Sequence, residues 1–124
     1  YNANIDSMRA AVAALEAIGK GRRTIAVLSE MLELGEDSPA THRAVGAMLS
    51  GAGVDALIGL GRDAHYYSEG AASVPDRVLV EDPGAALAAV LDRLTDDCVV
   101  LVKGSYNSYS WQVADGLLEE ATTR

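Results

Sequence analysis

The residues best suited to chemistry follow the apolar run Cys98–Val102, near the end of the chain. Lys103 supplies an ammonium group, Gly104 permits close approach of a backbone, and residues 105–108 add hydroxyl and amide donors. Such a set suits a carboxylate or a phosphate group. The same residues are equally consistent with a loop of turn formers whose lysine side chain extends to solvent.

Three further polar segments each follow a point where a strand is expected to end. They contain Asn2 and Asn4; Glu30, Met31 and Glu33; and Arg62 and Asp63. The acidic segment 30–37 could bind a cation or an ammonium group, although a solvated acidic surface is the simpler interpretation. Apolar residues lie among its acids, at positions 31, 32 and 34, and predict that this segment packs against something.

Helical and strand-like patterns alternate along the chain. Helices are predicted over 8–18, from 39 to 51 or 53, over 62–72 and 83–94, and around 113–118. Strands are predicted over 24–28, 54–60, 78–80 and 98–102. Ser38 and Asp82, each followed by proline, are the predicted N-caps of two helices. A further strand is expected just before Tyr1, because the opening polar residues are typical of the exit from a strand into a helix.

This alternation predicts one α/β domain over residues 1–124: a three-layer, Rossmann-like fold whose mostly parallel sheet has helices on both faces. In such a sheet, ligands bind at the carboxyl ends of the strands. The four polar segments should therefore lie along one edge of the sheet.

Composition excludes several classes of function. The net charge of −8 disfavours a nucleic-acid partner, and no apolar run is long enough for a membrane span. The single Cys98 is expected to be a buried, reduced thiol, which fits a cytoplasmic protein. A P-loop and a complete dinucleotide fingerprint are both missing from the sequence. His42 and His65 lack metal-ligand spacing and are predicted on helix surfaces, so no metal site is expected.

Four blocks of sequence, in order, resemble the C-terminal domain of the Mur ligases. They are Tyr1–Asn4 with Asp6–Ala11, Ala26–Glu36, Asp55–Gly61 and Val100–Ser105. The match covers essentially the whole chain. It is nearest to the branch that adds D-alanyl-D-alanine to a UDP-linked muramoyl tripeptide in peptidoglycan precursor synthesis.

The resemblance implies an ATP-dependent ligase. ATP activates the terminal carboxylate as an acyl phosphate, and the amine of the dipeptide then attacks it. ATP and Mg²⁺ would be bound mainly by a central domain that this chain lacks. The C-terminal domain would close over that central domain. The resemblance therefore implies that this domain alone is inactive and that no catalytic residue is to be assigned in it.

The resemblance also implies site residues. The nucleotide-facing positions are Tyr1, Asn2 and Asn4, and the substrate-facing positions are Glu30, Met31, Lys103, Ser105, Tyr106 and Asn107. The chain departs from the family pattern at Ile5, where proline is usual, at Ser29, where glycine is usual, and at Tyr106–Asn107, where Arg–Ser is common. Two alternatives stay open: a sister ligase with another amine substrate, and a non-catalytic binding or scaffold module of the same fold.

Overall fold

Four parallel strands form one sheet in the computed structural model, which describes residues 4–104. The elements in chain order are α1 (Ile5–Ile18), β1 (Arg23–Ser29), η1 (Gly35–Asp37), α2 (Ser38–Gly51), β2 (Ala56–Leu60), η2 (Arg62–Ala64), α3 (His65–Gly70), β3 (Asp76–Val80), α4 (Pro83–Arg93) and β4 (Cys98–Lys103). The predicted helix around 113–118 lies outside the described residues. So do the candidate site residues Tyr1, Asn2, Ser105, Tyr106 and Asn107.

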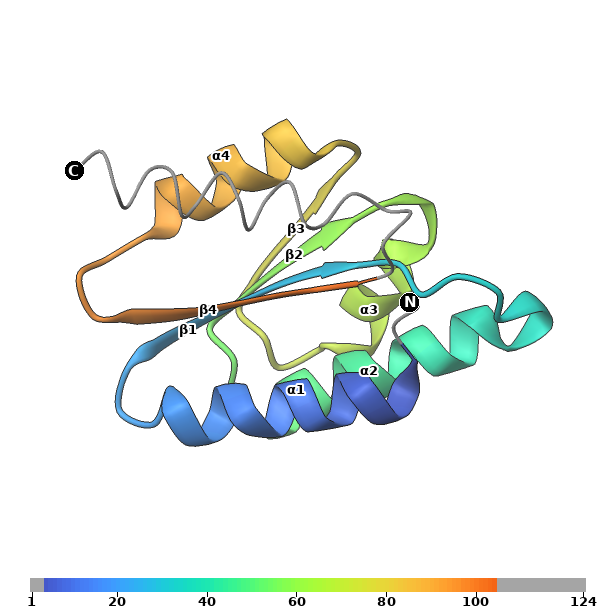
Figure 1. Cartoon of the computed structure of the whole chain (residues 1–124), viewed down its shortest axis with the longest axis horizontal. Helices are drawn as coiled ribbons and strands as arrows, with labels where there is room; N and C mark the ends of the chain where they lie inside the picture. The colour runs from blue at the N-terminus through green and yellow to red at the C-terminus, as the bar shows by residue number, and fades with distance from the viewer. Residues whose placement is uncertain (1–3, 105–124) are drawn as a thin grey trace.

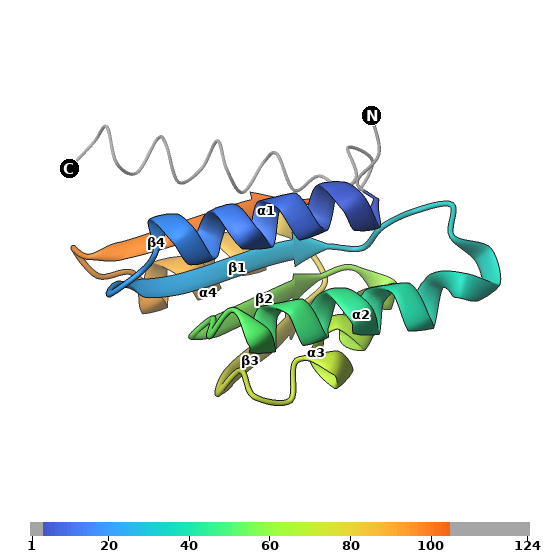
Figure 2. The ribbon, with the colours of Figure 1, turned by 90° about the horizontal axis from the view of Figure 1, so that it is seen from below.

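The strand order is β3-β2-β1-β4, and every pairing is parallel. Helices α1, α2 and α3 lie against one face of the sheet and α4 lies against the other (Figure 1). Figure 2 shows the first face, with α1 and α2 in front of the sheet and running along the direction of the strands. The predicted three-layer α/β architecture is therefore confirmed.

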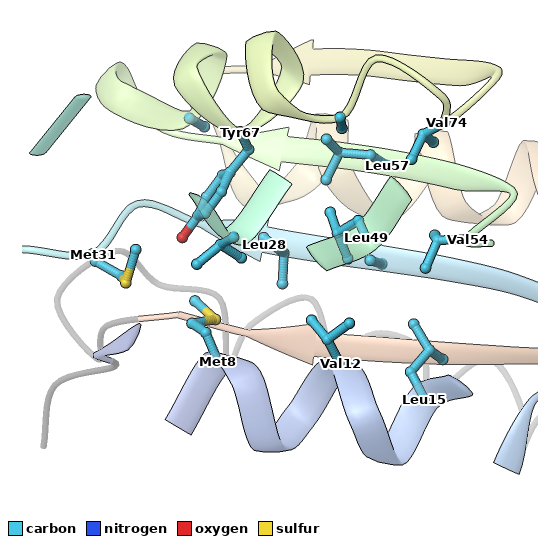
Figure 3. Close-up of a cluster of buried hydrophobic side chains, with 14 residues drawn as sticks. Met8, Val12, Leu15, Leu28, Met31, Leu49, Val54, Leu57, Tyr67 and Val74 are labelled. Carbon is cyan, nitrogen blue, oxygen red and sulfur yellow. The ribbon is translucent and has the colours of Figure 1, made fainter. Parts of the chain in front are cut away.

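Strand β1 contributes to both hydrophobic cores because its successive side chains point to opposite faces. Ala26 and Leu28 belong to the core under α1, α2 and α3, whereas Ile25 and Val27 belong to the core under α4. Figure 3 shows the larger core, in which Met8, Met31 and Tyr67 lie at the same end. This places the first turn of α1 near the end of β1.

The starts of the helices follow local capping chemistry. The side chain of Asp82 accepts a 2.8 Å hydrogen bond from the N–H of Ala85 and caps α4, as predicted. The prediction that Ser38 caps α2 was wrong: Asp37 is the N-cap and Ser38 is the first helical residue. The hydroxyl of Ser38 instead bonds to another loop, because the fold brings a carboxylate within its reach.

Within residues 4–104, no helix is long and apolar enough to cross a membrane. Cys98 has a free thiol but is only partly buried, since it begins β4, which pairs with β1 alone among the described strands. The expectation of a buried thiol was therefore wrong.

Candidate functional site

The carboxyl ends of the strands lie at one edge of the sheet. Ser29 at the end of β1 is in register with Leu60 at the end of β2, and Leu60 with Val80 at the end of β3. On the other side, Lys103 ends β4 beside Leu28 of β1. Glu30 and Asp63, in the loops after β1 and β2, and Lys103, at the end of β4, therefore lie at the same edge of the sheet, as predicted.

Glu30 is held in place by contacts with the loop after β2. Its N–H donates to the carbonyl of Leu60 (3.1 Å), and its Oε2 accepts a 3.0 Å hydrogen bond from the N–H of Asp63. Gly61, with φ of 108°, lies against this carboxylate, and an added Cβ there would be 2.9 Å from Oε1. Position 61 thus requires glycine both for its backbone conformation and for the space that Glu30 occupies.

A chain of hydrogen bonds continues from Asp63 into α2. Asp63 accepts a 2.8 Å hydrogen bond from the hydroxyl of Ser38, and Ser38 lies one helical turn before His42. Nδ1 of His42 is 2.7 Å from the carbonyl oxygen of Ser38, and Nε2 accepts a 2.9 Å hydrogen bond from the N–H of Met31. Since Met31 follows Glu30 in the sequence, these contacts close a ring, which we call the Glu30–His42 ring.

The surface position predicted for His42 was wrong, because its side chain is fully buried. It lies edge-on to the ring of Tyr67, with centroids 4.7 Å apart. The sequence did contain a signal, since His42 shares one helical stripe with Val45 and Leu49, and both are fully buried. His65 is partly exposed and lies beside Tyr66.

Tyr67 supports the end of β1 from α3. Its hydroxyl donates a 2.8 Å hydrogen bond to the carbonyl of Ser29, and the whole side chain is buried. Burial, and to a lesser extent the carboxylate of Glu30, raise the pKa of the Tyr67 hydroxyl above its ordinary value. The phenol is therefore a neutral donor at physiological pH, and it fixes the backbone directly before Glu30.

Gly104 packs directly against Ser29 at the neighbouring strand end. A Cβ at position 104 would overlap the Ser29 hydroxyl and lie 2.7 Å from its Cβ. Lys103, just before this contact, is half-buried. The close backbone approach that Gly104 permits is thus made to β1 of the protein itself. It places the ammonium group of Lys103 on the strand next to the one that Glu30 follows.

Two predicted site residues also have structural partners. The side chain of Asn4 accepts a 2.9 Å hydrogen bond from the N–H of Ser7 and caps α1, while the Ser7 hydroxyl accepts from the N–H of Asn4. The side chain of Met31 is buried in the larger core, so the acidic loop does pack against the protein, as its apolar residues predicted. Their nucleotide- and substrate-binding roles stay predictions.

A cavity of about 490 Å³ adjoins the ends of β2 and β3. It is lined by Gly61, Arg62, His65, Leu79, Val80 and Glu81. Arg62, which the sequence grouped with the site loops, faces this cavity, whereas Asp63 belongs to the Glu30–His42 ring. In the part of the chain that the structure describes, no three His, Cys, Asp or Glu side chains come together as a metal site.

The sequence is similar to a known protein family and to curated proteins. A family model described as "Mur ligase, glutamate ligase domain" matches residues 1–106. The UDP-N-acetylmuramoyl-tripeptide–D-alanyl-D-alanine ligase of Mycobacterium leprae is 36% identical over 142 aligned residues, which cover 100% of this chain and 28% of that protein. The ligase of the same name from Escherichia coli K12 is 33% identical, covering 98% of this chain and 26% of that protein.

Solved structures share the fold. MurF from Acinetobacter baumannii matches with a TM-score of 0.82 and 26% identity, covering 96% of this chain and 27% of that one. The MurF ligase of Thermotoga maritima, solved in complex with ADP, matches with a TM-score of 0.74 at 23% identity over 93% of this chain. The chain spans about a quarter of the length of the curated relatives that it matches.

Proposed function

Because the chain belongs to the Mur ligase family, matching its glutamate ligase domain, we propose that it acts as the C-terminal domain of a ligase that joins D-alanyl-D-alanine to a UDP-N-acetylmuramoyl tripeptide. The observation that carries this proposal is the identity of 33% and 36% to two ligases of that name along 98–100% of this chain. The complete enzyme would also contain the ATP-binding central domain that the family resemblance implies.

The reaction joins a carboxylate to an amine. The γ-phosphoryl group of ATP passes to the tripeptide carboxylate and ADP leaves. The dipeptide nitrogen then attacks the acyl phosphate carbon, the C–N bond forms, inorganic phosphate leaves and the nitrogen loses a proton. We assign the phosphoryl transfer to the central domain. Mg²⁺ would likewise be held mainly by the central domain, as the family resemblance implies.

The charges at the sheet edge complement a dipeptide. D-alanyl-D-alanine carries an amine at one end and a carboxylate at the other. Glu30 follows β1 and Lys103 ends the neighbouring β4, so a carboxylate and an ammonium group lie at the ends of adjacent strands. We assign the carboxylate of Glu30 to the amine and the ammonium group of Lys103 to the dipeptide carboxylate.

The remaining roles follow the family resemblance. Asn4, with Tyr1 and Asn2, would approach the nucleotide, and ADP in the Thermotoga maritima structure is in keeping with ATP as the energy source. Met31, Ser105, Tyr106 and Asn107 would complete the substrate side. Closure of this domain on the central one would orient the reactants and exclude water. We place the enzyme in the cytoplasm, where the family makes its precursor.

The test is a kinetic comparison in the full-length ligase. We expect Lys103→Met to raise the KM for D-alanyl-D-alanine about 10- to 100-fold, as for the loss of a charged hydrogen bond, with the KM for ATP unchanged. Lys20→Met is the matched control. Lys20 is an exposed lysine just before the start of β1, whereas the proposed site lies at the end of that strand.

Other outcomes separate the alternatives. Ligation of a different amine in preference to D-alanyl-D-alanine would indicate a sister ligase. A full-length protein that forms no amide with any amine would indicate a scaffold module. If Lys103→Met and Lys20→Met behaved alike, the role assigned to Lys103 would be wrong.

A further inference from the structure

The Glu30–His42 ring joins three segments that are separate in the sequence. Met31 belongs to the loop after β1, Ser38 and His42 to α2, and Asp63 to η2 after β2. Each member contributes a hydrogen bond of 2.7 to 3.0 Å to the next. The ring therefore ties the loops after two adjacent strands to two buried side chains, Ser38 and His42, in the first two turns of α2.

The direction of each hydrogen bond in the ring is determined. The N–H of Met31 can only donate, so Nε2 of His42 carries no hydrogen and accepts. The hydrogen of a neutral imidazole is then on Nδ1, which donates to the carbonyl of Ser38. The Ser38 hydroxyl donates to the acceptor Asp63. The two hydrogen bonds that His42 makes are buried, whereas those that Asp63 makes are partly buried.

A polar ring at this depth has a stability cost. His42 is fully buried and Ser38 is only 7% exposed. An apolar side chain at position 42 would avoid the desolvation of an imidazole. The imidazole of His42 accepts from the N–H of Met31, which directly follows Glu30. On its other side it donates to Ser38, which is connected through Asp63 to the Glu30 carboxylate. What the imidazole adds over an apolar side chain is a fixed position for that carboxylate.

We propose that His42 and Ser38 are positioning residues that hold the Glu30 carboxylate in place to accept the incoming amine. This inference rests on the proposed function and identifies the residues that prepare the amine side of that site. The imidazole itself transfers no proton in the reaction. Its role is to fix the main chain at Met31, while Ser38 and Asp63 fix Oε2 of Glu30 from the other side. Pre-ordering of this kind lowers the cost of aligning the nucleophile.

The experiment uses the full-length ligase with three variants. His42→Leu introduces an apolar side chain of similar size and loses both hydrogen bonds. His42→Gln keeps an acceptor that can reach the Met31 N–H. Val45→Ala is the control, because Val45 is fully buried in α2 and its side chain can make no hydrogen bond in the ring. The measurements are kcat and KM for ATP and for D-alanyl-D-alanine, with hydrogen exchange of residues 30–34.

We expect His42→Leu to lower kcat/KM for the dipeptide about 10- to 100-fold, with KM for ATP unchanged and faster exchange in 30–34. His42→Gln should recover most of the activity, and Val45→Ala should retain it. If His42→Leu matched Val45→Ala in both measurements, His42 would be a core residue only and the inference would be overturned while the ligase function stood. If the wild-type enzyme ligated no D-alanyl-D-alanine, the proposed function would be wrong and the inference about its amine side would fall with it.

Discussion

The hydroxyl of Tyr67 donates a 2.8 Å hydrogen bond to the carbonyl of Ser29, joining α3 to the last residue of β1. The contact spans 38 positions of sequence and lies within the larger core. It fixes the strand end from which the acidic loop departs.

Replacing Tyr67 by phenylalanine should lower the free energy of unfolding by about 1–3 kcal/mol, since the buried carbonyl of Ser29 loses a partner. Because the pKa of Tyr67 is raised in the folded state, its contribution is complete below the ordinary tyrosine pKa of about 10 and is lost as pH rises beyond it. Urea unfolding at a series of pH values from 7 to 11 would show a smaller alkaline loss in Tyr67→Phe than in the wild type. Equal alkaline losses would contradict the assignment.

The ion pair between Asp76 and Arg93 should make the stability of the protein depend on pH in the acid range. Arg93 Nε donates to one carboxylate oxygen at 2.7 Å and a terminal nitrogen donates to the other at 3.2 Å. The hydrogen bond from Arg93 is the main cause that lowers the pKa of Asp76. A lowered pKa contributes stability above the ordinary aspartate value of about 4, and this is lost as pH falls through the folded-state pKa.

Asp76→Asn should therefore cost about 0.5–1 kcal/mol at pH 7, a modest value because the carboxylate is about a third exposed. The cost should shrink below pH about 4. Chemical denaturation at pH 7 and pH 3 would measure it. Asp6→Asn is the comparison, because Asp6 pairs with Arg9 at a largely exposed site, where an ion pair contributes little. A cost that did not change with pH would argue against the ion pair.

The tautomer of His42 can be observed directly. The hydrogen bond from Met31 requires that Nε2 carry no hydrogen and that Nδ1 carry one. Long-range ¹H–¹⁵N correlation of the imidazole rings should show this single tautomer for His42, whereas the partly exposed His65 serves as an internal comparison. A hydrogen on Nε2 of His42 would show that the Glu30–His42 ring is not formed.

Because Gly104 packs against Ser29, we expect substitutions at these two positions to have non-additive effects on stability. Gly104→Ala should destabilise the protein by about 1–3 kcal/mol, because the added methyl group overlaps the buried Ser29 side chain. In the double variant Ser29→Gly with Gly104→Ala, the overlap with the hydroxyl is removed and most of that cost should be recovered. Gly51→Ala is a control, since a Cβ there meets nothing within 4 Å. Additive effects in the double variant would mean that the two positions do not compete for space.

The fold was largely predictable because its signals are local. The apolar run in β1 is buried on both faces, and the Asp82–Pro83 signal starts α4 at the predicted position. Element ends were less predictable: β2 begins at Ala56 rather than Val54, and β3 begins at Asp76 rather than Val78. Strand ends depend on pairing with a neighbour, which a single segment does not reveal.

The candidate site was predicted only in part. The strand-end rule placed Glu30, Asp63 and Lys103 at one edge, and the register confirms that placement. Ser38 and His42 were missed because a polar residue on a helix is usually exposed. Their partners lie in other loops, so their burial depends on contacts that the helix alone does not specify.

The sequence by itself determined the alternation of helices and strands, the polar loops that follow the strands, and the resemblance to one family. These are properties of periodicity, of turn chemistry and of ordered blocks within short stretches of chain. Only the tertiary structure decided that His42 would be buried against Met31, that Gly61 would make room for Glu30, and that Gly104 would rest on Ser29. Each of these depends on packing between segments far apart in sequence, where the space left by one side chain sets what its neighbour can do.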